Sequence, residues 1–301
     1  MKLLMTPDKA SYDVFTRIVA PRSARVMELM QGKLGGPMSE GQEPARQAVV
    51  RYLEYLQWPV RQMEYSFVLH ALNRYSNRSN ISSILDIGSG PSPFPPMLSE
   101  AFKSEVISAD TDEGMMEFMR RLGLPGCSFA AADMRSLPFG DRSFDAVCSV
   151  SVLEHVARED GIQAVSEMLR VVKERGIVVL TVDYRSLGSA QRMLKVLSRL
   201  RSAAAILLSR GAASMIKAAS APGPYTWGDL SSLCARFHNS LVGEPDQSWA
   251  RLNLGRIRAF WRDHWRDGFH YDGRIGRDYT SVGLILSPQP DGVRHCVEED
   301  R

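Results

Sequence analysis

The chain lacks the features that mark a disulfide-bonded, zinc-binding or membrane-spanning protein. Its four cysteines are far apart and have neither the paired spacing of a zinc site nor that of a disulfide framework: Cys127, Cys148, Cys234 and Cys296. No uncharged apolar run approaches the roughly 18 residues that a membrane span needs. Residues 1–10 show no apolar core followed by a cleavage site. We therefore expect reduced thiols, no metal site and a cytoplasmic location.

Charge also identifies no partner. The 301 residues carry a formal net charge of only +3, so the placement of charges matters more than their total. A hydrophobic fraction of 44% and a charged fraction of 24% are those of a globular protein. The sequence has no internal repeat and no low-complexity tract.

The hydrophobic pattern changes near residue 80. Residues 1–79 have helical spacing and predict an N-terminal helical cap. Beyond them, short apolar strands alternate with helical segments, which predicts an α/β fold with a doubly wound, mostly parallel sheet. We expect strands at 83–88, 105–110, 127–133, 144–150, 176–184, 239–245 and 280–288, with helices at 95–102, 113–123 and 161–174. This domain spans 80–290, contains a helical insertion at 185–224 and is followed by a polar tail at 291–301.

The first predicted strand ends in a glycine-rich turn, at the edge where open parallel sheets bind ligands. Gly88 and Gly90 allow a close backbone approach because they lack Cβ. A dinucleotide fingerprint would need a small residue at position 93 and free N–H groups nearby. Pro91 and Pro93 cannot donate hydrogen bonds, which disfavours a pyrophosphate ligand.

Acidic residues end the next two predicted strands. Asp110 is placed to accept hydrogen bonds from both hydroxyls of a ribose. Asp133 is placed to take a hydrogen bond from an exocyclic amine, with Met134 able to pack on an aromatic ring. Together with the glycine turn, these residues predict an adenosine ligand without phosphates.

The ordered motifs LDIGSG, VISAD, AADMRSLPFGDRSFDAVCSV, LEHV and LRVVKERGIVVL resemble those of class I S-adenosylmethionine (SAM)-dependent methyltransferases, over about residues 82–184. The resemblance implies SAM as cofactor. It implies that Asp86, Gly88 and Gly90 hold the methionine part and that Asp110 binds the ribose. It also implies adenine contacts from Asp133 and Met134, and a backbone contact from Val150 to the methionine amino group.

Two positions depart from the family pattern. Ser92 replaces the third glycine of the first motif, and residues 174–176 replace the usual Pro-Gly-Gly before the fifth strand. We expect 174–176 to form a turn away from the cofactor.

Structural alternatives remain for the candidate site residues. The glycines can merely shape a turn, and Asp133 can be a turn residue. Asp110 can cap the next helix, although Asp112 is better placed for that role.

His155 is either a general base or a structural residue near the cofactor. Ser151 stands where related quinone O-methyltransferases would need an acid, which argues against a metal. Arg61, Glu64 and Tyr65 either close over the methionine carboxylate or form an ordinary helix surface, and we favour the surface.

The stretch 184–228 contains no acidic residue, and its basic residues lie at helical spacing. Residues 185–217 therefore predict either a peripheral membrane contact or a lid over the acceptor pocket. The aromatic stretch around Trp261, His264, Trp265, His270 and Tyr271 either lines that pocket or forms a small core.

The resemblance leads to methylation of a small-molecule, glycan or lipid-linked acceptor at oxygen. The alternatives are an RNA or protein methyltransferase that grips through the basic insertion, and a non-catalytic SAM-binding protein. Nucleic acid is disfavoured because the fourth strand ends in CSVSV, without the tetrad that holds a flipped base. The sequence gives no oligomeric state.

Overall fold

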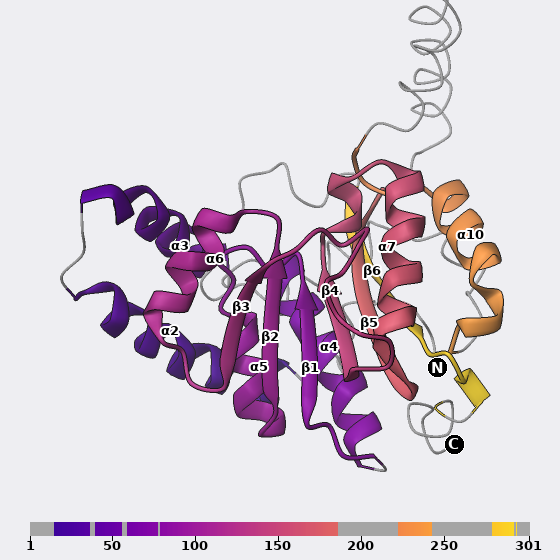
Figure 1. Cartoon of the computed structure of the whole chain (residues 1–301), viewed down its shortest axis with the longest axis horizontal. Coiled ribbons are helices and arrows are strands. Elements are labelled where there is room, and N and C mark those ends of the chain that lie inside the picture. Colours follow the sequence, from indigo (N-terminus) through magenta and orange to yellow (C-terminus); the bar gives the residue numbers. More distant parts are fainter. Residues whose placement is uncertain are drawn as a thin grey trace, which may run out of the picture.

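The computed structural model describes residues 15–36, 40–55, 59–77, 79–185, 222–242, 279–291 and 293. Within them, one sheet has the strand order β3-β2-β1-β4-β5-β6 (Figure 1). The strands are β1 (Ser83–Ile87), β2 (Glu105–Asp110), β3 (Cys127–Ala131), β4 (Phe144–Val150), β5 (Val172–Arg185) and β6 (Tyr279–Leu286). β6 runs antiparallel to β5, and the other neighbours are parallel. The predicted doubly wound sheet is confirmed.

Helices cover both faces of this sheet. They are α2 (Ala20–Leu34), α3 (Glu43–Tyr55), α4 (Pro59–Ser76), α5 (Phe94–Phe102), α6 (Glu113–Leu122), α7 (Arg158–Val171) and α10 (Trp227–Arg236). Shorter helical turns span Phe15–Val19, Glu40–Gln42, Leu153–His155 and His238–Ser240. α4 and α5 pack together on one face, and α7 covers the other (Figure 1). The predicted helical character of the N-terminal region holds in its described residues.

The central strands are buried on both faces. In β1 the residues from Ile84 to Ile87 are all buried, and in β5 Ile177 to Val182 are fully so. Such strands read as continuous apolar runs because helices cover both sides of a parallel sheet. At the antiparallel edge α4 approaches β6 so closely that a Cβ at Gly283 would lie 2.6 Å from Phe67 Cδ1. A side chain at position 283 would therefore require the Phe67 ring to move.

Three predicted segments are wrong in detail. The helix expected over 161–174 ends at Val171, because Val172 already pairs with Phe144 at the start of β5. Residues 174–176 consequently belong to β5 instead of a turn, at a place where the register with β4 shifts between Phe144 and Ala146. They lie near the amino end of β5, whereas the glycine turn follows the carboxyl end of β1. The strand expected over 239–245 is, in its described part, a 3-10 turn followed by a single bridge from Leu241 to Leu286.

Asp112 caps α6, as predicted, since its carboxylate accepts a hydrogen bond from the Met115 N–H at 2.9 Å. We expect Asp112→Ala to lower the free energy of unfolding by about 1 kcal/mol, because a helix N-terminal N–H loses its acceptor. Chemical denaturation measures the change. Asp112→Asn is the matched control and should retain stability, because asparagine caps equally well. Equal stability of Asp112→Ala and the wild type would contradict the capping role.

Candidate functional site

The turn after β1 requires its two glycines. Gly88 and Gly90 have φ values of +72° and +51°, in the left-handed region that glycine favours. A Cβ at Gly88 would lie 2.5 Å from Val152 Cγ2, so the turn passes directly against the segment that follows β4. The Gly88 N–H donates to the Ala109 carbonyl at 2.7 Å. The backbone of this turn is therefore fixed between β2 and the segment after β4.

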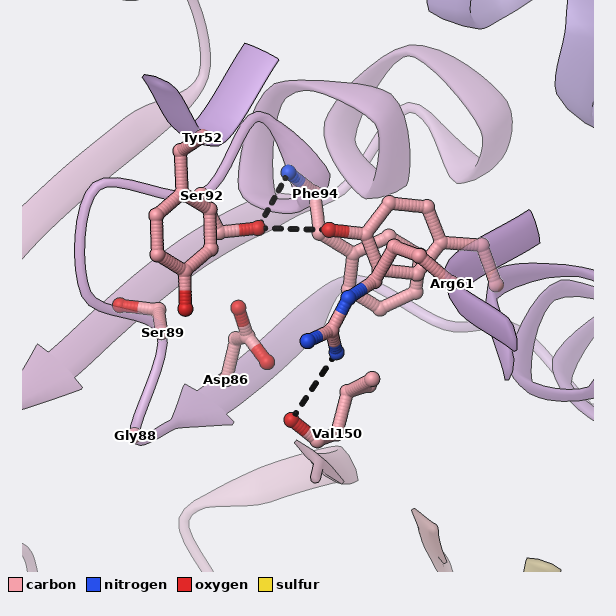
Figure 2. A pocket seen from close by; sticks show the side chains of 9 residues that line it. Tyr52, Arg61, Asp86, Gly88, Ser89, Ser92, Phe94 and Val150 are labelled. Atoms are coloured by element: carbon pink, nitrogen blue, oxygen red, sulfur yellow. Dashed lines mark hydrogen bonds between the residues drawn. The ribbon is translucent and has the colours of Figure 1, made fainter. Parts of the chain in front are cut away.

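The start of α5 offers no free donor in the described β1–α5 turn. The Phe94 N–H donates to Ser92 Oγ at 3.0 Å, and the next two residues are Pro95 and Pro96. Ser92 Oγ also lies 2.9 Å from the Tyr65 hydroxyl (Figure 2). A pyrophosphate needs free N–H groups at a helix start, so the geometry agrees with a ligand that lacks phosphates.

A small cavity opens beside this turn (Figure 2). Its lining comes from α3, α4, the end of β1, the β1–α5 turn, the start of α5 and the end of β4: Tyr52, Arg61, Tyr65, Asp86, Gly88, Ser89, Ser92, Phe94 and Val150. The Tyr65 and Phe94 rings stack with centroids 4.2 Å apart, which closes one wall with apolar surface. Sequence reasoning did not single out Tyr52, Ser89 or Phe94.

Our preferred reading of Arg61, Glu64 and Tyr65 as ordinary helix surface is wrong. The Arg61 side chain is 20% exposed, whereas Glu64 and Tyr65 are buried. Arg61 Nη1 lies 3.0 Å from Glu64 Oε2 and donates toward the Val150 carbonyl at 3.5 Å. In Figure 2 the guanidinium points toward Asp86 and the cavity. Burial lowers the pKa of Arg61, but the Glu64 charge opposes it and the net shift is upward, so the side chain is a cation.

Asp86 is a buried carboxyl group at the floor of the cavity (Figure 2). Burial raises its pKa to about 8, the Asp110 charge adds to the rise, and Arg61 partly offsets it. At neutral pH the free protein therefore keeps much of Asp86 protonated. A ligand cation placed nearby would favour its ionised form.

Asp110 organises the backbone of two turns. Its Oδ2 accepts from the Gly90 N–H at 2.9 Å and its Oδ1 from the Asp112 N–H at 3.1 Å. Asp110 thus does not cap α6, and its partly buried carboxylate stands beside the glycine turn. Ribose binding by Asp110 stays a prediction.

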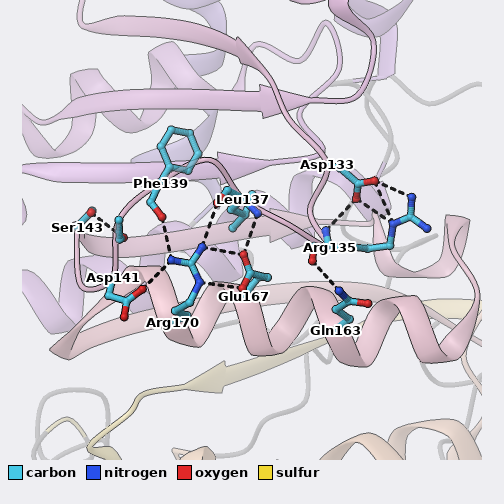
Figure 3. A network of polar contacts seen from close by, with 10 residues as sticks. Asp133, Arg135, Leu137, Phe139, Asp141, Ser143, Gln163, Glu167 and Arg170 are labelled. Atoms are coloured by element: carbon cyan, nitrogen blue, oxygen red, sulfur yellow. Dashed lines mark hydrogen bonds and ion pairs between the residues drawn. The ribbon is translucent and has the colours of Figure 1, made fainter.

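Asp133 lies farther along the same edge and is ion-paired. Arg135 Nη2 contacts Asp133 Oδ2 at 2.6 Å, and hydrogen bonds from Arg135 hold the pKa of Asp133 below its usual value (Figure 3). Met134 is buried beside it. Adenine recognition by Asp133 and Met134 stays a prediction, and it requires Asp133 to share its carboxylate with Arg135.

The loop after β3 is tied to α7 by Arg170, a contact that the sequence did not reveal. Arg170 donates to the carbonyls of Leu137 and Phe139 at 3.0 and 2.8 Å, and pairs with Glu167 and Asp141 (Figure 3). Glu167 in turn accepts from the Leu137 N–H at 2.8 Å. The residues after Asp133 are therefore fixed to the helix behind them.

His155 does not line the cavity. It ends the 3-10 turn after β4, and its side chain is exposed. Its neighbour Glu154 is the buried titratable group of that turn: burial raises the pKa of Glu154 to about 8, and the Asp183 charge contributes. A catalytic role for His155 stays a prediction.

Other expected features fall partly or wholly outside the described residues. Residues 186–217 of the basic segment and the aromatic stretch from Trp261 to Tyr271 lie there. In the described part of the chain, no three His, Cys, Asp or Glu side chains are grouped to hold a metal ion. No helix in that part is long and apolar enough to cross a membrane. Cys127, Cys148 and Cys234 are free thiols.

The fold is an open α/β sheet with its cavity at the carboxyl end of β1. Residues 85–180 match a family model described as a methyltransferase domain. The demethylmenaquinone methyltransferase of Renibacterium salmoninarum is 30% identical over 182 residues, which cover 59% of this chain and 73% of that protein. The chain belongs to the class I SAM-dependent methyltransferases, and its cofactor is SAM.

Other similarities are more partial. The demethylmenaquinone methyltransferase of Clavibacter sepedonicus is 37% identical over 99 residues, covering 32% of this chain and 39% of that protein. The chain thus spans well under two thirds of that relative. The structure of geranyl diphosphate C-methyltransferase from Streptomyces coelicolor A3(2) aligns over 85% of this chain and 87% of that one, with 16% identity and a TM-score of 0.46.

Proposed function

We propose that the protein transfers the methyl group of SAM to an oxygen atom of a small-molecule, glycan or lipid-linked acceptor. The supporting observation is the cavity itself, whose lining includes the Arg61 cation and the Asp86 carboxyl group. The glycine turn that lines it is held by the Asp110 carboxylate, which accepts a hydrogen bond from the Gly90 N–H. Two relatives named for a small-molecule acceptor, demethylmenaquinone, favour the small-molecule class.

SAM supplies an activated methyl group on a sulfonium, so the protein chiefly positions the two reactants. Arg61 is suited to the methionine carboxylate, because a guanidinium can form two parallel hydrogen bonds with it. Asp86 and the Val150 carbonyl are acceptors suited to the methionine amino group. The stacked rings of Tyr65 and Phe94 exclude water from one wall of the cavity.

Methylation of RNA or protein is the alternative, and it requires the basic segment at 185–217 to bind that substrate. That segment lies largely outside the described residues, as does any membrane contact through 185–217. A mass-spectrometric screen of candidate acceptors with SAM distinguishes these classes. Methylation confined to RNA or protein would contradict the proposed acceptor class.

We expect Asp110→Ala to weaken SAM and S-adenosylhomocysteine binding at least tenfold. The substitution removes a carboxylate acceptor for the ribose and frees the Gly90 N–H that fixes the glycine turn. Isothermal titration calorimetry measures both affinities. Asp112→Ala, which removes the neighbouring carboxylate that only caps α6, is the matched control and should bind like the wild type. A wild-type protein that binds neither ligand would contradict the proposed function.

A further inference from the structure

Glu64 lies at the centre of a buried polar cluster that joins four parts of the fold. Its Oε1 accepts hydrogen bonds from the hydroxyls of Ser151, after β4, of Thr181 on β5 at 3.2 Å and of Ser281 on β6 at 2.7 Å. Its Oε2 pairs with Arg61 on its own helix, α4, at 3.0 Å. We call these five residues the Glu64 cluster. One fully buried carboxylate therefore divides its two oxygens between three hydroxyls and one cation.

The cluster fixes an unusual backbone conformation. Ser151 has a φ of +53°, which is uncommon for any residue with a Cβ. Its N–H donates to the Thr181 carbonyl at 3.1 Å, and its hydroxyl donates to Glu64. The residue before it is Val150, whose carbonyl faces Arg61. Glu64 thus contacts both the Arg61 side chain and the hydroxyl of Ser151, and the turn at Ser151 follows the Val150 carbonyl that Arg61 faces.

We infer that Glu64 is a positioning residue that holds Arg61 and the Ser151 turn so that the guanidinium and the Val150 carbonyl face the methionine end of the cofactor. This inference rests on the proposed function. Buried ion pairs seldom stabilise a fold more than apolar side chains of the same size would. The Arg61 partner, moreover, points into the cavity (Figure 2). A role in orienting the Arg61 guanidinium accounts for the charge of Glu64 at this buried position.

An amide cannot replace this carboxylate. Glutamine has one acceptor oxygen, so it can serve either the hydroxyls or Arg61, while its NH₂ group faces the other side as a donor. Facing the hydroxyls, which can also accept, the two N–H groups of the amide can bond at most two of the three; facing Arg61, the NH₂ group repels the guanidinium. Glu64→Gln therefore weakens the hold on either the hydroxyls or the guanidinium, and in both cases it removes the negative charge that pairs with Arg61. In both cases the groups that would contact the methionine end move, whereas the nucleoside end at Asp110 is untouched.

The test compares S-adenosylhomocysteine with 5′-methylthioadenosine, which has the same nucleoside and thioether but no amino acid end. By isothermal titration calorimetry, Glu64→Gln is expected to weaken S-adenosylhomocysteine binding about tenfold and to change 5′-methylthioadenosine binding less than about twofold. Glu117→Gln is the matched control: Glu117 also pairs with arginines, Arg120 and Arg121, but on the exposed side of α6. It should bind both ligands like the wild type.

A double-mutant cycle checks the link to Arg61. Arg61→Gln should weaken S-adenosylhomocysteine binding, and adding Glu64→Gln should weaken it no further. The double variant also leaves no buried charge without its partner, because both members of the ion pair are removed. Equal losses for both ligands, or unchanged or tighter S-adenosylhomocysteine binding by Glu64→Gln, would overturn the positioning role. A wild-type protein that binds neither ligand would instead overturn the proposed function, and the inference with it.

Discussion

Gly88→Ala is expected to lower the free energy of unfolding by about 2–5 kcal/mol and to abolish measurable SAM binding. The alanine would have to adopt a φ of +72°, which costs an L-residue roughly 1–2 kcal/mol. Its Cβ would lie 2.5 Å from Val152 Cγ2 and 3.0 Å from Val152 Cβ, and overpacking adds roughly 1–3 kcal/mol. Val152 is β-branched and buried, so it has little freedom to move away. Urea denaturation and calorimetric titration measure the two effects.

Gly90→Ala is the matched control. Position 90 has a similar φ of +51°, but, apart from the adjacent residues, the nearest atom to a Cβ there would be the Tyr52 hydroxyl at 3.8 Å. It should therefore show only the conformational cost. The double substitution Gly88→Ala with Val152→Ala should recover the overpacking part of the loss at position 88. If Gly88→Ala proved as stable as Gly90→Ala, close packing against Val152 would not be the reason for the glycine.

Asp86→Asn is expected to stabilise the protein above pH 8 by several kcal/mol. The pKa of Asp86 is raised from 3.8 to about 8 in the folded state, so the folded state binds more protons between these values. Stability consequently falls as the pH rises from about 4 to 8, by up to about 1.4 kcal/mol per pH unit. Asparagine removes this cost, and the two proteins should converge near pH 4. Denaturation across this pH range measures the difference.

Asp145→Asn is the control, because its effect on the free energy of unfolding is expected to have the opposite sign to that of Asp86→Asn. Burial alone would raise the pKa of Asp145, but hydrogen bonds from Lys173, Ser82 and Ser83 outweigh burial and hold it at about 2. Asp145→Asn should therefore lose stability at neutral pH, and the loss should disappear as the pH falls toward 2. A loss of stability in Asp86→Asn at pH 8 would show that the Asp86 carboxylate is satisfied in the folded protein.

Cofactor binding should offset the loss of folding stability that ionised Asp86 causes. A cofactor cation beside it lowers its pKa, so wild-type SAM binding should release protons and strengthen as the pH rises from 5 to 8. Titrations in buffers with different ionisation heats detect the released protons. Asp86→Asn should bind SAM more weakly and without this pH dependence. Such an exchange of stability for binding is common at functional sites.

The sheet could be predicted from the sequence because its signals are local. The central parallel strands β1, β4 and β5 contain apolar runs that are nearly continuous, and the acids at the strand ends follow directly from strand positions. Asp112 was recognisable as the cap of α6 from its position just before the helix. The start of β5 was missed because Val172 and Lys173 continue the helical spacing of α7, and only the pairing of Val172 with Phe144 begins the strand.

The Glu64 cluster could not be predicted in the same way, because Ser151, Thr181 and Ser281 are distant from α4 in the sequence. A weaker signal was present in α4 itself. The helix PVRQMEYSFVLHALNRYS has apolar residues on every side, which is typical of a buried helix. Two opposite charges three residues apart in such a helix, Arg61 and Glu64, are therefore expected to pair inside the protein.

The blocked start of α5 has a consequence for competition among ligands. ATP and the nicotinamide dinucleotides share adenosine with SAM, so a site that recognised adenosine alone would accept them too. With Phe94 N–H bonded to Ser92 and prolines at the next two positions, a phosphate placed there would lose its water without gaining a hydrogen bond from the backbone at the start of α5. This turn can therefore discriminate against phosphorylated nucleosides, because it offers their phosphates no free N–H group. SAM has no phosphate, so the lack of these donors does not weaken its binding.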